Sequence, residues 1–192
     1  MENSYRKGLK MRSAVLINVV IFIALSVTGY GLMMYFDQHA TPPASPMVQA
    51  ADFSLTSTEG STHTLADFRG KNVILNFWAS WCAPCIKEFP TLLDVAEQNK
   101  KDTVLIALSY DLTDEAMLKF LKNMKAKGHN WEQPHIIIAR DEKDIAGKLY
   151  GITRFPETLL INANGEIGDR FVGAEWTADD MNNSLIKLHE AQ

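Results

Sequence analysis

The clearest chemistry in the 192-residue chain belongs to its two cysteines, Cys82 and Cys85, which are separated by two residues. A thiol pair at this spacing can exchange disulfides, ligate a metal or attach haem. Haem attachment requires a histidine directly after the second cysteine, and Ile86 stands there. A structural zinc site needs four ligands, but the chain has no second cysteine pair and its histidines are scattered. The spacing therefore favours a redox-active dithiol without metal or cofactor, and leaves metal binding as the alternative.

The cysteine pair lies where a strand is predicted to end and a helix to begin. The apolar run Val73-Ile74-Leu75 predicts a buried strand over 71–78, and apolar residues at helical spacing predict a helix from Cys85 onward. The free N–H groups and the positive dipole end of a helix N-terminus stabilise a thiolate. We therefore expect Cys82 to be the attacking sulfur and Cys85 to be the more buried, resolving thiol.

Strands and helices alternate along the rest of the domain. The patterns predict strands over 103–110, 135–139 and 157–162, and helices over 113–127 and 142–150. Asn164-Gly165 predicts a hairpin that joins 157–162 antiparallel to 166–172, and Thr177 with Asp180 predicts the start of a last helix. Together these elements predict an α/β mixed sheet with helices on both faces.

The N-terminal part has a different composition from the domain. Residues 14–36 carry no charge and are long enough to cross a bilayer, and four basic residues precede them. We expect a cytoplasmic tail at 1–13, a transmembrane signal-anchor at 14–36, a Pro-rich linker at 37–50 and a folded domain at 51–192. The domain would then lie outside the cytoplasm, on the periplasmic side of the inner membrane; a cleaved signal peptide is the alternative. The net charge of −4 disfavours a nucleic-acid binder.

Several motifs make residues 51–190 resemble a known family. They are Asn76–Cys85 (NFWASWCAPC), Lys87–Pro90 (KEFP), Tyr150–Ile152, Phe155–Thr158 and Phe171–Gly173. In these motifs the domain resembles the thioredoxin fold, in its membrane-anchored reductase branch, the TlpA, ResA and DsbE group. The segment from Asp52 to Gly70 also resembles this branch, which implies an N-terminal hairpin extension.

The resemblance implies roles for residues beside the cysteines. Taken alone, Glu88 reads as a solvated helix carboxylate on the flank of the apolar arc. Thioredoxins place a buried acid where this chain has Asn76, and the resemblance makes Glu88 its replacement, a proton acceptor for the cysteines. It also implies that Pro156 is cis beside the pair and that the backbone of Phe155 binds an extended substrate segment. Trp81 is expected to rim the site as an aromatic that faces the partner.

The resulting expectation is a thiol–disulfide reductase acting on protein disulfide clients. The resemblance implies that a transmembrane thiol donor supplies electrons and that apocytochrome c, whose haem-binding cysteines must be reduced, is the leading client. Ala83-Pro84 and a nearby carboxylate favour a reductant over a disulfide-forming oxidase. The motifs are also consistent with a general reductase for different clients, or with a copper-handling module that uses the cysteines as soft ligands.

Overall fold

The structure, a computed structural model, describes residues 25–26, 28–31 and 47–190. Residues 25–26 and 28–31 are helical and belong to a unit that ends at Ser45, while the folded domain forms a second unit from Pro46. Among the described residues, no helix has the length and apolar character needed to cross a membrane. The predicted anchor at 14–36 falls largely outside the described residues, so it stays a prediction.

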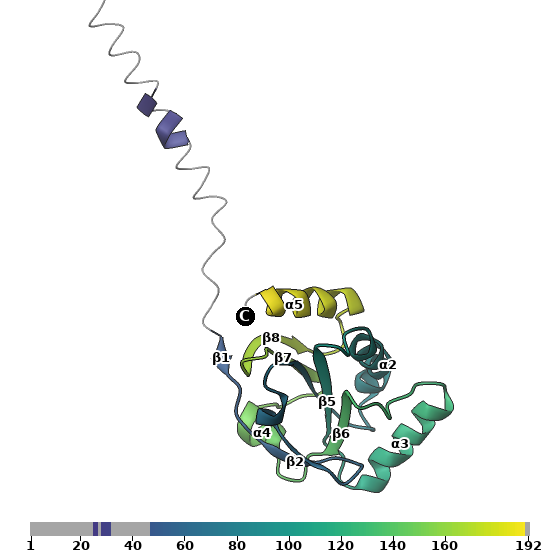
Figure 1. Cartoon of the computed structure of the whole chain (residues 1–192). Helices are drawn as coiled ribbons and strands as arrows, with labels where there is room; N and C mark the ends of the chain where they lie inside the picture. The colour runs from purple at the N-terminus through teal and green to yellow at the C-terminus, as the bar shows by residue number, and fades with distance from the viewer. Residues whose placement is uncertain (1–24, 27, 32–46, 191–192) are drawn as a thin grey trace, which may run out of the picture. The chain divides into compact units, whose positions relative to one another are not determined.

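A mixed sheet forms the centre of the described domain (Figure 1). Its strands, in chain order, are β1 (Val48–Gln49), β4 (Asn72–Trp78), β5 (Thr103–Ser109), β6 (Ile136–Arg140), β7 (Glu157–Ile161) and β8 (Glu166–Val172). They lie in the spatial order β1-β8-β7-β4-β5-β6. β4, β5 and β6 run parallel, whereas β7 is antiparallel to both β4 and β8. The mixed sheet and the antiparallel hairpin after Asn162 are therefore confirmed.

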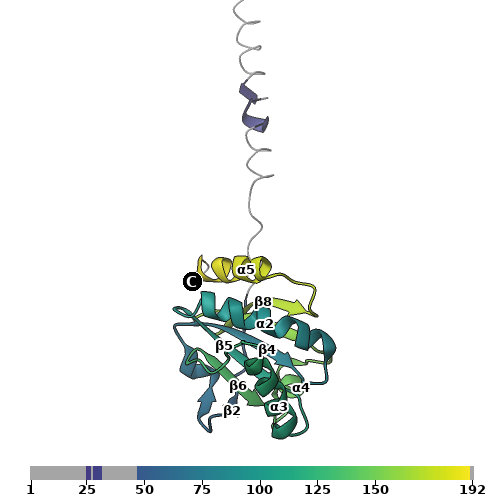
Figure 2. The same cartoon turned by 90° about the vertical axis from the view of Figure 1, so that its right-hand side faces the viewer.

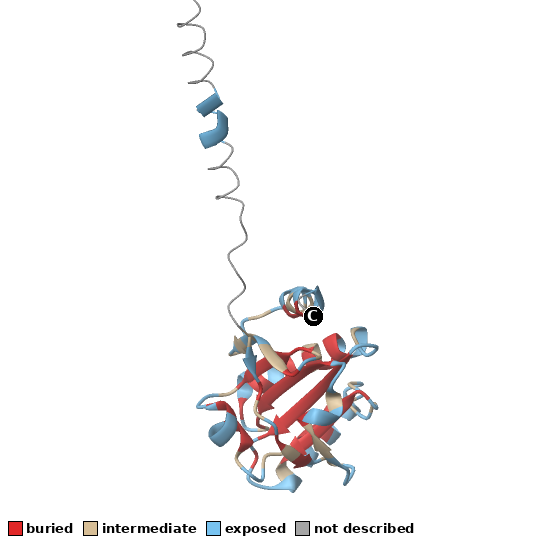
Figure 3. Cartoon of the chain, turned by 60° about the vertical axis from the view of Figure 1, so that its left-hand side comes forward, coloured by how far each residue is buried: buried red, intermediate tan, exposed pale blue. Residues whose placement is uncertain are grey.

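Helices cover both faces of this sheet (Figures 1 and 2). The helices are α2 (Ala83–Gln98), α3 (Asp114–Ala126), α4 (Ile145–Tyr150) and α5 (Ala178–Glu190). Because side chains alternate along a strand, Ile74 and Trp78 of β4 pack with α2, α3 and α5, whereas Val73, Leu75 and Phe77 pack with α4. The central strands are buried from end to end (Figure 3).

A short hairpin precedes the first long strand, as the resemblance implies. β2 (Ser54–Thr56) pairs antiparallel with β3 (Thr62–Thr64), and a 3-10 turn, η1 (Leu65–Phe68), follows. Leu55 and Leu65 are buried on the α4 side of the sheet. The hairpin thus closes the face of the core that α4, with only six residues, leaves uncovered.

The domain begins earlier than the expected boundary at residue 51. Val48 and Gln49 pair with Ile167 and Glu166 of β8, and the Gln49 side chain donates a 2.6 Å bond to the carbonyl of Gly165. A two-residue strand has too little pattern to be read from sequence, particularly after a Pro-rich segment. Residues 48–50 therefore belong to the sheet edge rather than to a spacer.

The helix expected over 142–150 is shorter than its pattern suggests. Asp144 adopts a left-handed backbone conformation with φ of 56°, which a continuing α-helix excludes. Asp141 caps the helix instead, because its carboxylate accepts the backbone N–H groups of Ile145 and Ala146 at 2.7 and 2.8 Å. α4 consequently starts at Ile145, and its end at Gly151 agrees with the prediction.

Candidate active site

The cysteine pair lies at the start of α2, directly beyond the carboxyl end of β4. Cys82 is the N-cap residue, with extended backbone, and Pro84 occupies the first helical turn, where its missing N–H costs nothing. The two sulfurs form a disulfide, and the backbone N–H of Cys85 points at Cys82 Sγ over 3.3 Å. Cys82 is 6% exposed, and Cys85 is completely buried. The attacking position expected for Cys82 therefore coincides with the helix N-terminus and with the more exposed of the two cysteines.

A buried carboxylate that sequence reasoning missed holds the loop leading to Cys82. Asp111, which is 4% exposed, accepts the backbone N–H of Ser80 at 3.0 Å and its hydroxyl at 2.7 Å. Asp111 also accepts the Ser109 hydroxyl at 2.6 Å. The sequence signal that could have identified Asp111 is topological, since polar residues that follow two adjacent parallel strands meet at one edge of the sheet. Asp111 ties the end of β5 to the loop two residues before the first cysteine.

Glu88 lies one helical turn after Cys85 and is buried rather than solvated. Its exposed fraction is 6%, and each carboxylate oxygen accepts one N–H. Asn76 Nδ2 donates to Oε1 at 3.1 Å, and Trp176 Nε1 donates to Oε2 at 3.0 Å. Asn76 itself is fixed in β4 by a 2.9 Å bond to Thr158 of β7.

The surroundings of Glu88 change its acidity strongly. Burial raises the pKa of Glu88 from 4.5 to about 7, and the bonds from Trp176 and Asn76 act in the opposite direction. A carboxyl group with this pKa is about half ionised near neutral pH. It can therefore take a proton and return it, which is the property required of a proton acceptor beside a thiol.

The aromatic residues around the pair form a surface that the sequence predicted in part. Trp81 is 63% exposed, and its ring meets that of half-buried Phe155 edge-on, with centroids 6.1 Å apart. Tyr110, which sequence reasoning did not select, lies 5.0 Å from Phe155 and is 40% exposed. The Phe155–Pro156 peptide bond is cis, and Pro156 is buried at the start of β7. We call Trp81, Tyr110 and Phe155 the aromatic rim.

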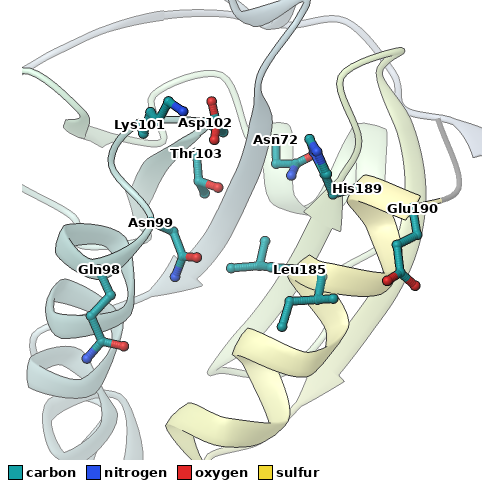
Figure 4. A pocket seen from close by; sticks show the side chains of 10 residues that line it. Asn72, Gln98, Asn99, Lys101, Asp102, Thr103, Leu185, His189 and Glu190 are labelled. Atoms are coloured by element: carbon teal, nitrogen blue, oxygen red, sulfur yellow. The ribbon is translucent and has the colours of Figure 1, made fainter.

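A separate cavity of about 390 Å³ lies at the opposite end of the central strands (Figure 4). Asn72 and Thr103, the first residues of β4 and β5, contribute to its wall together with His189 of α5. Seven strand residues, on the order of 20 Å, separate that end from the loop that carries the cysteines. The cavity is therefore not part of the dithiol site.

In the part of the chain that the structure describes, no three histidine, cysteine or acidic side chains gather in a geometry suited to a metal ion. The arrangement around Cys82 and Cys85 provides a cysteine pair, a buried carboxyl group and the aromatic rim. These are the components that thiol–disulfide exchange needs.

Comparison with known proteins agrees with this chemistry. Residues 45–185 match the Redoxin family model. The chain is 32% identical to the thiol-disulfide oxidoreductase ResA of Bacillus cereus over 180 residues, which cover 92% of this chain and 98% of ResA. It is 34% identical to the thiol:disulfide interchange protein DsbE of Pseudomonas fluorescens over 164 residues, 84% of this chain and 85% of DsbE. The crystal structure of StoA from Bacillus subtilis superposes with a TM-score of 0.57 at 27% identity, covering 74% of this chain and 98% of StoA.

Proposed function

Since the chain belongs to the redoxin family of thiol–disulfide oxidoreductases and has the thioredoxin fold, we propose that it is an extracytoplasmic disulfide reductase. Its proposed task is to keep the haem-binding cysteines of apocytochrome c reduced. The observation that carries the direction of the reaction is the buried carboxylate of Glu88, one turn beyond Cys85. The position of Cys82 at the helix N-terminus supports the assignment of the attacking sulfur.

The proposed reaction is a two-electron dithiol–disulfide exchange. The Cys82 thiolate attacks one sulfur of a client disulfide, the client S–S bond breaks, and the first client sulfur leaves as a thiolate. Cys85 then loses its proton and attacks Cys82 Sγ, which breaks the mixed disulfide and releases the second client sulfur. The client gains two electrons, and the Cys82–Cys85 disulfide seen in the structure is the product.

Glu88 is proposed to serve the second of these attacks. Cys85 is completely buried, so its proton cannot pass directly to solvent. Residues three apart on a helix are neighbours, which supports a Glu88 carboxylate close enough to the Cys85 thiol to exchange a proton with it. The carboxylate takes that proton when the pair is oxidised and returns it when the pair is reduced again. An ionised carboxylate also disfavours the neighbouring thiolate, which raises thiol pKa values and makes the dithiol a stronger reductant.

The aromatic rim is proposed to receive the client. Trp81, which directly precedes the buried Cys82, and Tyr110, which packs against Phe155, present exposed aromatic surface. An extended client segment that lies against Phe155 and Pro156 would bring its disulfide to the Cys82 sulfur, and apolar side chains beside the client cysteines would pack on Trp81. Protein clients should therefore react faster than small disulfides that cannot reach the rim.

The membrane location is proposed from the uncharged stretch at 14–36 and the basic residues before it. An anchor there would hold the domain outside the cytoplasm, next to a transmembrane thiol donor that reduces the Cys82–Cys85 disulfide. Confinement to one surface raises the effective concentration of enzyme, donor and client, so a weak client-binding surface can suffice.

A deletion strain tests the client assignment. We expect it to lose covalent haem staining of c-type cytochromes, and an added external thiol should restore staining by reducing the apocytochrome directly. Normal cytochrome c together with a defect in another disulfide client would contradict the apocytochrome c assignment and support a general disulfide reductase. Stoichiometric copper binding by the reduced chain, abolished in Cys82→Ser, together with a defect in copper-centre assembly, would favour the copper-handling alternative.

A further inference from the structure

Trp176 lies in the connection between β8 and α5, 88 residues away from Glu88 in sequence, yet a hydrogen bond joins the two side chains directly. The indole Nε1–H donates to Glu88 Oε2 at 3.0 Å. In the sequence, Trp176 is simply the residue before Thr177, where the last helix is expected to start. Its contact with the buried carboxylate one helical turn after Cys85 calls for a role of its own.

The position of the indole is fixed from two sides. Its ring packs against Phe171 of β8, with centroids 5.9 Å apart, and against the core between α2 and α5. The next residue, Thr177, forms a reciprocal cap with Asp180: the Thr177 N–H reaches Asp180 Oδ2 at 2.8 Å, and the Asp180 N–H reaches Thr177 Oγ1 at 3.2 Å. The cap and the ring contact hold the Nε1–H on the carboxylate.

The groups that face Glu88 are few and come from three elements. Asn76 of β4 donates to Oε1, and Trp176 donates to Oε2. Cys85, three residues earlier on α2, becomes titratable only when its disulfide is reduced. No ion pair involves Glu88 within residues 47–190. The charge state of Glu88 is therefore controlled by burial and by two neutral N–H donors.

We propose that Trp176 is a positioning residue for disulfide exchange, whose indole N–H holds the Glu88 carboxylate in the ionised, proton-accepting state toward Cys85. The inference rests on the proton role proposed above for Glu88. An N–H donor binds a carboxylate more strongly than a carboxylic acid, so it favours the charged form. The ring acts in the opposite sense, because it covers Glu88 and excludes water.

These two effects of Trp176 can be separated by substitution. Trp176→Phe keeps most of the ring coverage and removes the donor, so the pKa of Glu88 should rise by about one unit. Trp176→Ala also admits water, and since burial is the main cause of the raised pKa, the value should fall toward 4.5. A residue with only a packing role would not shift the pKa in opposite directions in these two variants.

The test is the pH dependence of single-turnover reduction of a synthetic peptide disulfide by the fully reduced, full-length chain. Trp176→Phe should shift the acid limb of the rate profile toward higher pH by about one unit and slow the reaction about fivefold at pH 7. The matched control is Trp131→Phe, which removes an indole N–H bond of 3.1 Å to the Leu121 carbonyl of α3 and should leave the profile unchanged.

The Glu88→Gln background distinguishes the two ways of failing. If Glu88→Gln abolishes the acid limb but Trp176→Phe leaves it in place, the role of Trp176 is refuted and that of Glu88 stands. If Glu88→Gln does not change the profile, the proton role of Glu88 fails, and the inference about Trp176 fails with it. If both roles hold, Trp176→Phe has no further effect on the profile in the Glu88→Gln chain. Titration of carbon-13-labelled glutamate carboxyls in the oxidised chain reads the same pKa shift directly.

Discussion

Replacing Glu88 by glutamine should make the oxidised protein more stable relative to wild type as the pH rises. In the folded chain, burial raises the pKa of Glu88 from 4.5 to about 7. The folded state therefore binds the proton more tightly than the unfolded state, and ionisation at higher pH works against folding. Glutamine has a similar shape and cannot ionise, so the variant is not destabilised by ionisation at this position.

The size and the sign follow from linkage. A pKa raised from 4.5 to about 7, at about 1.4 kcal/mol per pKa unit, corresponds to about 3 kcal/mol. The cost is absent below about pH 4.5, grows between pH 4.5 and about pH 7, and is constant above that. Glutamine also turns one of its N–H groups toward the donors Asn76 or Trp176, which costs about 1 kcal/mol at every pH. The difference between variants at high and low pH, rather than either value alone, measures the effect.

Urea unfolding of the oxidised full-length chain, followed by tryptophan fluorescence, provides the assay. Between pH 4.5 and pH 8 the free energy of unfolding of Glu88→Gln should gain about 3 kcal/mol relative to wild type. The control Glu97→Gln removes an exposed carboxylate from the same helix, and no such gain is expected because the bond from Lys100 lowers the pKa of Glu97. A stability difference between Glu88→Gln and wild type that does not change with pH would refute the reasoning.

Four further outcomes are expected. In the reduced chain, alkylation at graded pH should modify Cys82 faster than Cys85, and the reverse order would exchange their roles. Asp111→Asn should lower the free energy of unfolding by about 2 kcal/mol in a urea titration, because it removes the charge that three donors bind; an unchanged midpoint would contradict this. Trp81→Ala should slow reduction of a protein client about tenfold and leave a small disulfide unaffected, whereas equal slowing of both would argue against client binding at the rim. Carbonate extraction should leave the chain in the membrane, and release of a soluble, shortened form would show that 14–36 is a cleaved signal.

The strands and long helices were predictable because their signals are local. The buried run Val73–Leu75 has few alternatives to a central strand, and the Thr177–Asp180 pair caps α5 as its spacing indicates. The left-handed backbone at Asp144 was not predictable, since it depends on capping by Asp141. The two-residue strand β1 exists only through its pairing with β8.

The candidate site likewise contains some residues that local signals predict and others that only the fold reveals. Cys82 and Cys85 are recognised from spacing and from the helix start that follows a buried strand. Periodicity alone favours a solvated Glu88 and misses its burial, and the Trp176 indole that binds its carboxylate lies 88 residues further along the chain. Asp111 and Tyr110 reach the site through the parallel pairing of β4 with β5, which no short-range pattern encodes. The local chemistry could be read from the sequence, but the residues that tune it required the fold.

The most direct test of the account is to identify the proteins trapped as mixed disulfides by a full-length Cys85→Ser chain in cells. Without the resolving thiol, the attack by Cys82 stops at the covalent intermediate. We predict capture of apocytochrome c through its haem-binding cysteines, and no capture when Cys82→Ser is added. Accumulation of mixed disulfides on Cys85 of a Cys82→Ser chain, with none on Cys85→Ser, would contradict the mechanism.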